Sequence, residues 1–381
     1  MLDLSEFESI SPYTDEEAVV ALGKLADHPL LSQFSCKFFP DQSPDFLKGL
    51  LKNITSIDEF QVLVMSKFVE WVLEHTVNDF TCDGISNIDP EKRFLALSNH
   101  RDIIFDPAIT QLVLFRNGIP LTEIAVGDNL VSSPTIEYLL RSNRMIKVIR
   151  GISARELYLS SQLLSKYIRI NITNQRSSIW LAQRQGRTKN GYDITEQGLL
   201  KMLDMSGKAD FQTNFEELNI IPMSVSYEFE PCDILKAVEI YISRRQKYVK
   251  AEGEDLKSIL TGIMQPKGRV HIQFNDPVSE QEVLAAAELD KNERFKALGI
   301  AMDRKIIANY KLWPNNYIAY DMLNGEGRFA DKYTTEEKVA FEGYLNAIMQ
   351  KVDKMEVDKA ELKEILLGIY ANPVVGKKNL E

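Results

Sequence analysis

The sequence predicts an α/β fold in which a central, largely buried mixed sheet lies between two helical regions. Short apolar runs alternate with helical segments from about residue 86 to residue 280, as in a sheet covered by helices. Apolar residues make up 44% of the chain and charged residues 26%, values that suit a globular protein with a substantial core. We therefore expect an N-terminal helical region (1–85), a central α/β domain (86–280) and a C-terminal helical region (281–381).

Four pairs of residues predict where helices begin outside the centre of the chain. In each pair, a Ser or Thr that can cap a helix is followed three residues later by Glu, which completes a capping box. The pairs are Thr14–Glu17, Ser56–Glu59, Ser279–Glu282 and Thr334–Glu337. On this basis residues 1–85 are expected to be helical, and residues 315–327 are expected to form a loop within the C-terminal region.

Six strands, with helices between them, are expected in the central domain. The strands are short apolar runs bounded by turn-forming residues, at 94–98, 124–126, 146–149, 178–182, 220–226 and 269–274. The expected helices between them include 133–141, 154–167 and 196–205. This alternation favours a sheet with helices on both faces.

Composition narrows the functional class. The net charge of −10 argues against a nucleic-acid-binding protein, whose surface is usually basic. No apolar stretch approaches the ~18–20 residues that a membrane-spanning helix needs. The acidic N-terminus lacks the basic segment of a secretory signal, and three cysteines without CxxC spacing indicate free thiols. A cytoplasmic location is therefore expected.

Neither a metal nor a cofactor is expected. The four histidines (His28, His75, His100 and His271) are too scattered to indicate a zinc site. His271 lies on an expected strand and is interpreted as a hydrogen-bonded core histidine. The sequence also lacks the glycine motifs that bind nucleotides and dinucleotides.

Positive charge is concentrated in one segment. Residues 141–189 contain eleven Lys or Arg side chains and a single acid, Glu156, so this segment carries +10 and the rest of the chain −20. Such an uneven distribution favours an anionic ligand, an anionic membrane surface, or both.

His100 follows the apolar run at 94–98, with Asp102 two residues later and Asp106 six residues later. A histidine at a strand end is a candidate general base, because its unperturbed pKa lies near neutrality. It needs a carboxylate to orient the ring and stabilise the imidazolium, and either aspartate is close enough in sequence.

Three further segments carry candidate binding residues. The run at 146–149 delivers Arg150 to a turn, and the run at 178–182 leads into a glycine-bounded basic loop, Gly186-Arg187-Thr188-Lys189. The third is an apolar run that contains Pro222. Arginine suits phosphate oxygens because its planar fork donates two hydrogen bonds, and glycine lets a backbone approach them. A base and a phosphate site on one sheet edge indicate an enzyme that acts on a hydroxyl of a phosphorylated substrate.

These segments, in this order, resemble the four motifs of the glycerophospholipid O-acyltransferase family, and most closely its glycerol-3-phosphate acyltransferase branch. The matching residues are Asn99-His100 with an aspartate, Val148-Ile149-Arg150, Gly186-Arg187-Thr188-Lys189 and Ile221-Pro222. Further likenesses to that branch lie at 126–130, at Tyr227-Glu228 and at 268–277.

The resemblance implies the α/β sandwich of that branch and a transfer of an acyl group. His100 would take the proton of an acceptor hydroxyl on glycerol 3-phosphate, and the donor would be acyl-CoA or an acyl carrier protein. Arg150, Arg187 and Lys189 would hold the acceptor phosphate, and the other substrate-binding residues would be Asn99, Gly186, Thr188 and Pro222. No metal or cofactor is implied, nor any particular oligomeric state.

The resemblance also implies a peripheral contact with the inner face of a membrane. Two alternatives stay open. One is the same reaction on 1-acylglycerol 3-phosphate or another lipid hydroxyl, and the other is a lipid-binding homologue without turnover.

Two departures from the family pattern affect the site. Five residues separate His100 from Asp106 where the family has four, and Gln185 stands where the third motif has Glu. A helix that begins near Asp102 would bring Asp106 back towards the imidazole, and Pro107 suits a first helical turn. We therefore favour Asp106 as the carboxylate that orients His100, with Asp102 capping the turn or pairing locally.

Overall fold

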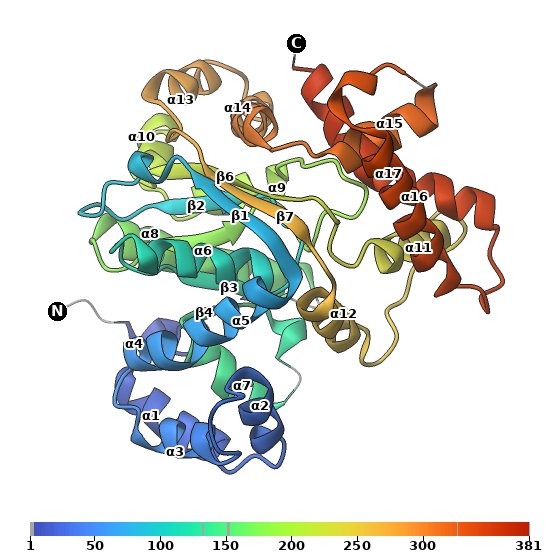
Figure 1. Cartoon of the computed structure of the whole chain (residues 1–381). Coiled ribbons are helices and arrows are strands. Elements are labelled where there is room, and N and C mark those ends of the chain that lie inside the picture. Colours follow the sequence, from blue (N-terminus) through green and yellow to red (C-terminus); the bar gives the residue numbers. More distant parts are fainter. Residues whose placement is uncertain (1–3, 132, 151–152, 326, 381) are drawn as a thin grey trace.

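The computed structural model describes residues 4–131, 133–150, 153–325 and 327–380 and has a seven-stranded sheet at its centre (Figure 1). The strand order is β1-β7-β6-β2-β5-β3-β4, and the paired strands are parallel except for β6 and β7, which are antiparallel. The expected α/β fold with a central mixed sheet is confirmed. The strands are β1 (Val77–Asp83), β2 (Leu95–Ser98), β3 (Glu123–Gly127), β4 (Met145–Val148), β5 (Ile179–Ala182), β6 (Ile220–Tyr227) and β7 (Gly268–Phe274).

Helices cover both faces of the sheet because its central strands are apolar on both sides. All four residues of β2 are buried, and its side chains alternate between two apolar clusters. Leu95 and Leu97 pack in the cluster that contains residues of α8 (Ala154–Thr173), α9 (Gln197–Asp204), α10 (Phe211–Glu216), α13 (Glu280–Ala287) and α14 (Glu293–Asn309). Ala96 packs in the opposite cluster, with α5 (Ser66–Thr76), α6 (Phe105–Arg116) and α7 (Pro134–Arg141).

The N-terminal helices form a small core of their own, at the lower end of Figure 1. They are α1 (Asp15–Leu25), α2 (Leu31–Phe38), α3 (Phe46–Asn53) and α4 (Ile57–Phe60), followed by a π-helical segment (Gln61–Met65) and α5. Thr14 caps α1 in a capping box with Glu17, and Ser56 caps α4 by accepting a hydrogen bond from the Glu59 amide. Tyr138 and Leu139 of α7 pack against this core and join it to the central domain.

The expectation that residues 1–85 are helical throughout is wrong at their end. Residues 77–83 form β1, an edge strand that pairs in parallel with β7. Its sequence, VNDFTCD, does not alternate strictly between apolar and polar residues, because Asn78 and Asp79 are both polar, so the period-two pattern of a strand is weak. Pairing with β7, almost two hundred residues later, determines its conformation, and local sequence does not carry that information.

The C-terminal helices form a third core together with α11 (Asp233–Ser243). They are α15 (Pro314–Asn324), α16 (Thr335–Gln350) and α17 (Lys359–Lys378), and they lie beside the sheet in Figure 1.

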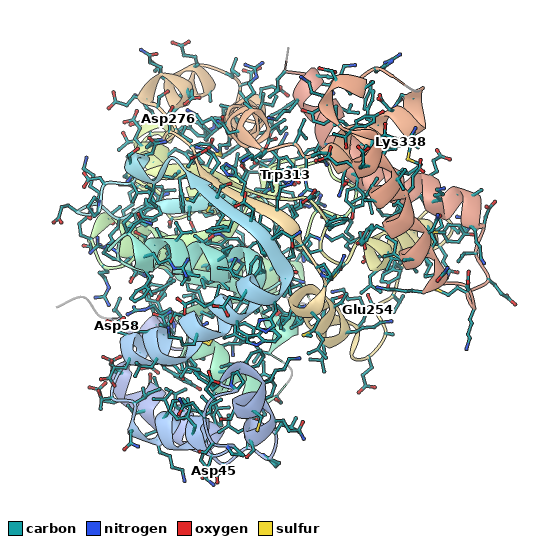
Figure 2. The ribbon with its side chains drawn as sticks, in the orientation of Figure 1. Asp45, Asp58, Glu254, Asp276, Trp313 and Lys338 are labelled. Carbon is teal, nitrogen blue, oxygen red and sulfur yellow. The ribbon has the colours of Figure 1, made fainter. Side chains whose placement is uncertain are left out.

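The expectation of a loop at 315–327 is wrong, because most of these residues belong to helix α15. Residue 326 lies outside the described residues. Trp313, labelled in Figure 2, precedes Pro314, and its amide donates to Asn316 Oδ1 over 2.8 Å. This cap and the buried Ile318 and Ala319 explain a helix that its Asn-rich sequence conceals.

The remaining expected elements agree with the structure to within one or two residues, except that α8 runs six residues past the end expected for it. Ser279 and Thr334 cap α13 and α16 in capping boxes with Glu282 and Glu337. His271 is buried, and its Nδ1 lies 2.8 Å from Thr81 Oγ1, as expected for a core histidine. Among the described residues, no helix is long and apolar enough to cross a membrane.

Helix α14 anchors the chain that leaves β5. The amide and hydroxyl of Thr195 both donate to Asp303 Oδ1, over 2.8 and 2.6 Å. Burial raises the pKa of Asp303 to about 6, although the bonds from Thr195 act in the opposite direction. The folded state therefore binds a proton at Asp303 more tightly than the unfolded chain does, and the stability this supplies at low pH is lost as the pH rises through about 6.

Asp303→Asn should therefore stabilise the protein at neutral and alkaline pH, because it removes a half-buried charge and keeps an acceptor for Thr195. We expect the free energy of unfolding, from urea titrations at pH 8, to rise by about 1–3 kcal/mol, and the gain to shrink as the pH falls towards about 4. Asp290→Asn, at an exposed position, is the control. A gain that does not change with pH would contradict this account of Asp303.

Candidate active site

His100 and Asp106 meet where β2 leads into α6. The turn after Ser98 carries His100, and Asp106 lies in the first turn of α6. His100 Nδ1 and Asp106 Oδ2 are 2.9 Å apart, and the His100 side chain is 13% exposed. Because a carboxylate only accepts, Nδ1 carries the proton of the neutral imidazole and Nε2 carries the lone pair. Among the described residues, no hydrogen-bond partner reaches Nε2.

The Asp106 carboxylate is fully buried and accepts four hydrogen bonds. Its Oδ2 accepts from His100 Nδ1 and from the amides of Arg101 (2.6 Å) and Asp102 (2.9 Å), and its Oδ1 accepts from the Tyr227 hydroxyl (2.5 Å). Burial alone would raise the pKa of Asp106, but the bonds from His100, Tyr227 and the backbone bring it below its ordinary value. Asp106 is therefore an ionised partner for the imidazole.

Asp102 has a different place. Its Oδ1 accepts hydrogen bonds from the amides of Ile104 and Phe105, over 2.9 and 2.8 Å, and so caps the start of α6. Its Oδ2 is buried and lies against Gly262, where an added Cβ would be only 2.2 Å away. The structure thus brings Asp106, and not Asp102, to the His100 ring, which is the arrangement that the sequence favours. The extra residue in the turn is accommodated because the buried Asp102 carboxylate accepts hydrogen bonds from the backbone of the turn.

A buried ionic network fixes the residue after His100. Arg101 is 0% exposed, and its Nη2 and Nη1 donate to Asp193 Oδ2 (2.7 Å) and Glu230 Oε2 (3.1 Å). Lys236 Nζ donates to Glu230 Oε1 (2.6 Å) and to the Arg101 carbonyl (2.7 Å). The positive charges of Arg101 and Lys236 are thus matched by the negative charges of Asp193 and Glu230, as burial of charge requires.

Asp193 ties the basic loop to the histidine turn. Its Oδ1 accepts from the Thr188 hydroxyl (2.8 Å), and its Oδ2 accepts from Asn99 Nδ2 (3.1 Å) as well as from Arg101. The Thr188 amide donates to the His100 carbonyl over 2.7 Å, which makes the two loops one unit. Asn99 and Thr188, expected to bind substrate, thus use their polar groups within the protein.

The arginines expected to bind phosphate lie around α12 (Glu254–Met264). Arg150 is exposed, and its guanidinium lies beside Gly127, where an added Cβ would be 2.7 Å from Nη2. Asn129, two residues further on, donates to Asp255 Oδ2 in the first turn of α12 over 3.0 Å. Burial alone would raise the pKa of Asp255, but its bonds to Lys250 and Asn129 and the nearby charge of Arg187 bring it below its ordinary value. Arg150 and Arg187 thus approach the same end of α12.

Arg187 and Lys189 differ in their partners. Arg187 Nη1 is buried, and no hydrogen-bond partner for it occurs among the described residues. Lys189 Nζ pairs with Glu239 of α11. Gly186, which precedes both cations, has a φ of +73° and is exposed, a conformation that suits glycine. Of the loop's two cations, Arg187 is the one without a carboxylate partner among the described residues.

The positive segment is mostly neutralised by the rest of the fold, which corrects the sequence-based picture of one concentrated field. Seven of its eleven cations form ion pairs with carboxylates: Arg141, Arg144, Lys147, Lys166, Arg169, Arg184 and Lys189.

The other four cations of the segment have no carboxylate partner among the described residues. Within the described ranges, Arg150, Arg155, Arg176 and Arg187 form no ion pair with a carboxylate. Two of these four, Arg150 and Arg187, are the arginines of the second and third motifs.

Pro222 belongs to the sheet. It lies inside β6, opposite Leu97 of β2, and is buried. Its carbonyl accepts a hydrogen bond from the Asn275 amide over 3.0 Å. These contacts are with neighbouring strands and the turn after β7, so its assignment to substrate binding stays a prediction.

Three residues near the site were not predicted to belong to it. Tyr227 bonds Asp106, Asp193 joins the two loops, and the Trp180 ring lies edge-on to His100 with centroids 5.7 Å apart. Tyr227 could have been found, because it ends the apolar strand that carries the fourth motif, and such strands pair side by side in the sheet. Asp193 follows no strand directly and belongs to no motif, so the sequence carries no signal for it.

Glu196 lies beside the position where the family has Glu and this chain has Gln185. Its Oε2 accepts from the Gln185 amide over 3.2 Å, and its Oε1 is 4.0 Å from Arg184 Nε. A carboxylate is thus present next to the basic loop, supplied from a residue outside the motif.

No protein-family model matches the chain, and no curated protein matches it. Among solved structures, it is similar to the 1-acyl-sn-glycerophosphate (LPA) acyltransferase PlsC from Thermotoga maritima, with a TM-score of 0.40 and 12% sequence identity. The match covers 76% of this chain and 95% of that chain. Values this low establish neither a shared fold nor a shared activity.

Asp193→Asn should destabilise the protein strongly, because it leaves the buried Arg101 guanidinium without one of its two anions. We expect the free energy of unfolding, measured by urea titration, to fall by about 3–5 kcal/mol. Glu196→Gln is the control, since it breaks a half-exposed pair and should change stability by about 1 kcal/mol or less. Equal effects of the two substitutions would show that the buried network does not hold the loops.

Proposed function

We propose that this protein is an acyltransferase, built on the sandwich of the glycerol-3-phosphate acyltransferase branch, that moves an acyl group from a thioester to a hydroxyl of glycerol 3-phosphate. One observation carries the proposal: the His100 imidazole is oriented by a buried, ionised carboxylate, and the His100 carbonyl accepts a hydrogen bond from the loop whose Arg187 lacks a carboxylate partner. Arg150, likewise unpaired, approaches the same helix end as Arg187. The order of these groups along the chain matches the four motifs of the glycerophospholipid O-acyltransferases.

The geometry suits general-base catalysis. With Nδ1–H held by Asp106, Nε2 takes the proton of the acceptor hydroxyl while its oxygen attacks the thioester carbonyl carbon. The tetrahedral intermediate collapses, the carbon–sulfur bond breaks, and the imidazolium returns the proton to the leaving thiolate. Asp106 stabilises the imidazolium without itself taking a proton, since its pKa is already lowered.

The acceptor phosphate is assigned to Arg150 and Arg187. Both have guanidinium donors that no carboxylate occupies within the described part of the chain, and a bidentate arginine matches phosphate oxygens. Lys189 is assigned a smaller part than the sequence indicates, because Glu239 already neutralises it.

The decisive experiment is a transfer assay with radiolabelled acyl-CoA and acyl-acyl carrier protein as donors. The acceptors are glycerol 3-phosphate, 1-acylglycerol 3-phosphate and glycerol. We expect an acylated product from glycerol 3-phosphate and none from glycerol, which lacks the phosphate. Transfer only to 1-acylglycerol 3-phosphate would replace the acceptor assignment, and no transfer to any acceptor would overturn the proposed activity in favour of a lipid-binding protein.

The two aspartates should differ sharply in their effect on turnover. His100→Ala and Asp106→Asn should each lower kcat by about 10²–10⁴-fold, because the base or its orienting charge is lost. Asp102→Asn keeps an acceptor for the helix cap and should cost about tenfold or less. Circular dichroism of each variant checks the fold, and the reverse ranking of the aspartates would refute the assigned roles.

The two cations of the basic loop should also differ. Arg187→Ala should raise the KM for glycerol 3-phosphate by at least about tenfold, the loss of one charge-assisted hydrogen bond, and leave the donor KM nearly unchanged. Lys189→Ala is the matched comparison and should have the smaller effect on that KM, because its charge is paired with Glu239. If the donor KM rises instead, Arg187 binds the donor and the phosphate assignment is reversed.

A further inference from the structure

Helix α12 exposes three of its five large apolar side chains. Leu256, Leu260 and Met264 are 58%, 52% and 47% exposed, and their four-residue spacing places them along one face of the helix. Its buried residues are Ser258 and Gly262. A helix of a globular protein normally turns its apolar face to the core, whereas α12 turns Ile263 and two small residues inward and leaves three large apolar side chains exposed.

Close packing explains why small residues face inward. Gly262 lies against the Asp102 carboxylate, and the Ser258 carbonyl accepts from Cys232 Sγ over 3.2 Å. Asp255 at the other end is tied to Asn129. The helix is therefore held firmly against the candidate site, and its outward apolar face is not the result of loose packing. In Figure 2, Glu254 marks the start of α12 at the edge of the molecule.

The start of α8 is a second exposed apolar surface. Every residue from 153 to 159 is exposed, and Leu157, Tyr158 and Leu159 are 52%, 58% and 51% exposed. A capping box between Ser153 and Glu156 stabilises this end of the helix in the absence of packing.

Both surfaces adjoin the basic part of the candidate site. Helix α8 begins four residues after Arg150, whose guanidinium lies beside Gly127, and Asn129 bonds the first turn of α12. Three exposed cations accompany the apolar side chains: Arg150, Arg155 and Lys257. Within the chain as described, these three form no ion pair with a carboxylate.

We propose that the outer face of α12 and the first two turns of α8 form a docking surface for a bilayer with anionic head groups. Apolar side chains flanked by unpaired cations are the composition of interfacial helices. A second copy of the chain fits less well, because a symmetric interface would bring the same unpaired cations together. This inference rests on the proposed function, because a docked bilayer would place the acyl-transfer site next to the lipid surface.

Vesicle flotation tests the proposal directly. The probes are vesicles of phosphatidylcholine alone or mixed with phosphatidylglycerol, and the test variant is L256S/L260S/M264S. The matched control is L284S/L289S/I300S, which changes three comparably exposed apolar residues on α13, α14 and the segment between them. We expect the wild type and the control to float with anionic vesicles, and the α12 variant to bind at least about tenfold more weakly. Urea unfolding of both variants checks that each is folded.

Removal of a positive charge provides a second test of the docking surface. Arg155→Ala should weaken binding to anionic vesicles and leave binding to neutral ones unchanged, and added salt should have the same effect as the substitution. Failure of the wild type to float, or flotation of the α12 variant equal to the wild type, would overturn the proposal. So would a concentration-dependent dimer, seen by light scattering, that the α12 substitutions abolish.

The docking surface and the proposed activity can be refuted independently of each other. His100→Ala protein should bind vesicles as the wild type does, since binding needs no turnover. A wild type that floats but transfers no acyl group refutes the activity alone, and one that transfers an acyl group but does not float refutes the docking surface alone.

Discussion

The arrangement of the candidate site depends on one buried carboxylate, that of Asp106. Removal of a charge from water is costly, and it is tolerated here because four donors surround the two oxygens. Those donors come from the turn after β2 and from Tyr227 on β6, so the strands must lie in their observed register. The same requirement orients the imidazole. Stability and ring orientation are therefore two effects of one set of hydrogen bonds.

Asp193 and Arg101 extend this constraint to the basic loop. The two loops lie about ninety residues apart in sequence, yet Thr188, Asn99 and Arg101 all bond Asp193. Because the charges are buried, neither loop can shift without exposing an unpaired ion to a poorly solvating interior. Asn99 and Thr188, which the sequence predicts to bind substrate, thus help to fix the position of the loop that carries Arg187.

The central strands could be predicted from the sequence because they are buried on both faces and show as apolar runs. The contact of His100 with Asp106 could be predicted too, since a short turn and a helix start leave few geometries. Strand β1 could not, because its conformation depends on β7, and α15 could not, because its cap and packing outweigh an Asn-rich composition. The local sequence overstates the positive field of residues 141–189, because the acidic partners of that segment, such as Asp58 and Glu217, lie outside it in the chain.

The pairing of β1 with β7 bears on how the chain folds as it leaves the ribosome. Residues 77–83 are made early, but their partner at 268–274 follows only after nearly the whole α/β domain. Until then β1 has an open edge on both sides, the kind of surface from which chains aggregate. The antiparallel pair of β6 and β7 closes late as well. During synthesis the sheet therefore stays incomplete until residues 268–274 have been made, and the edges of β1 are open to pairing with other chains in that interval.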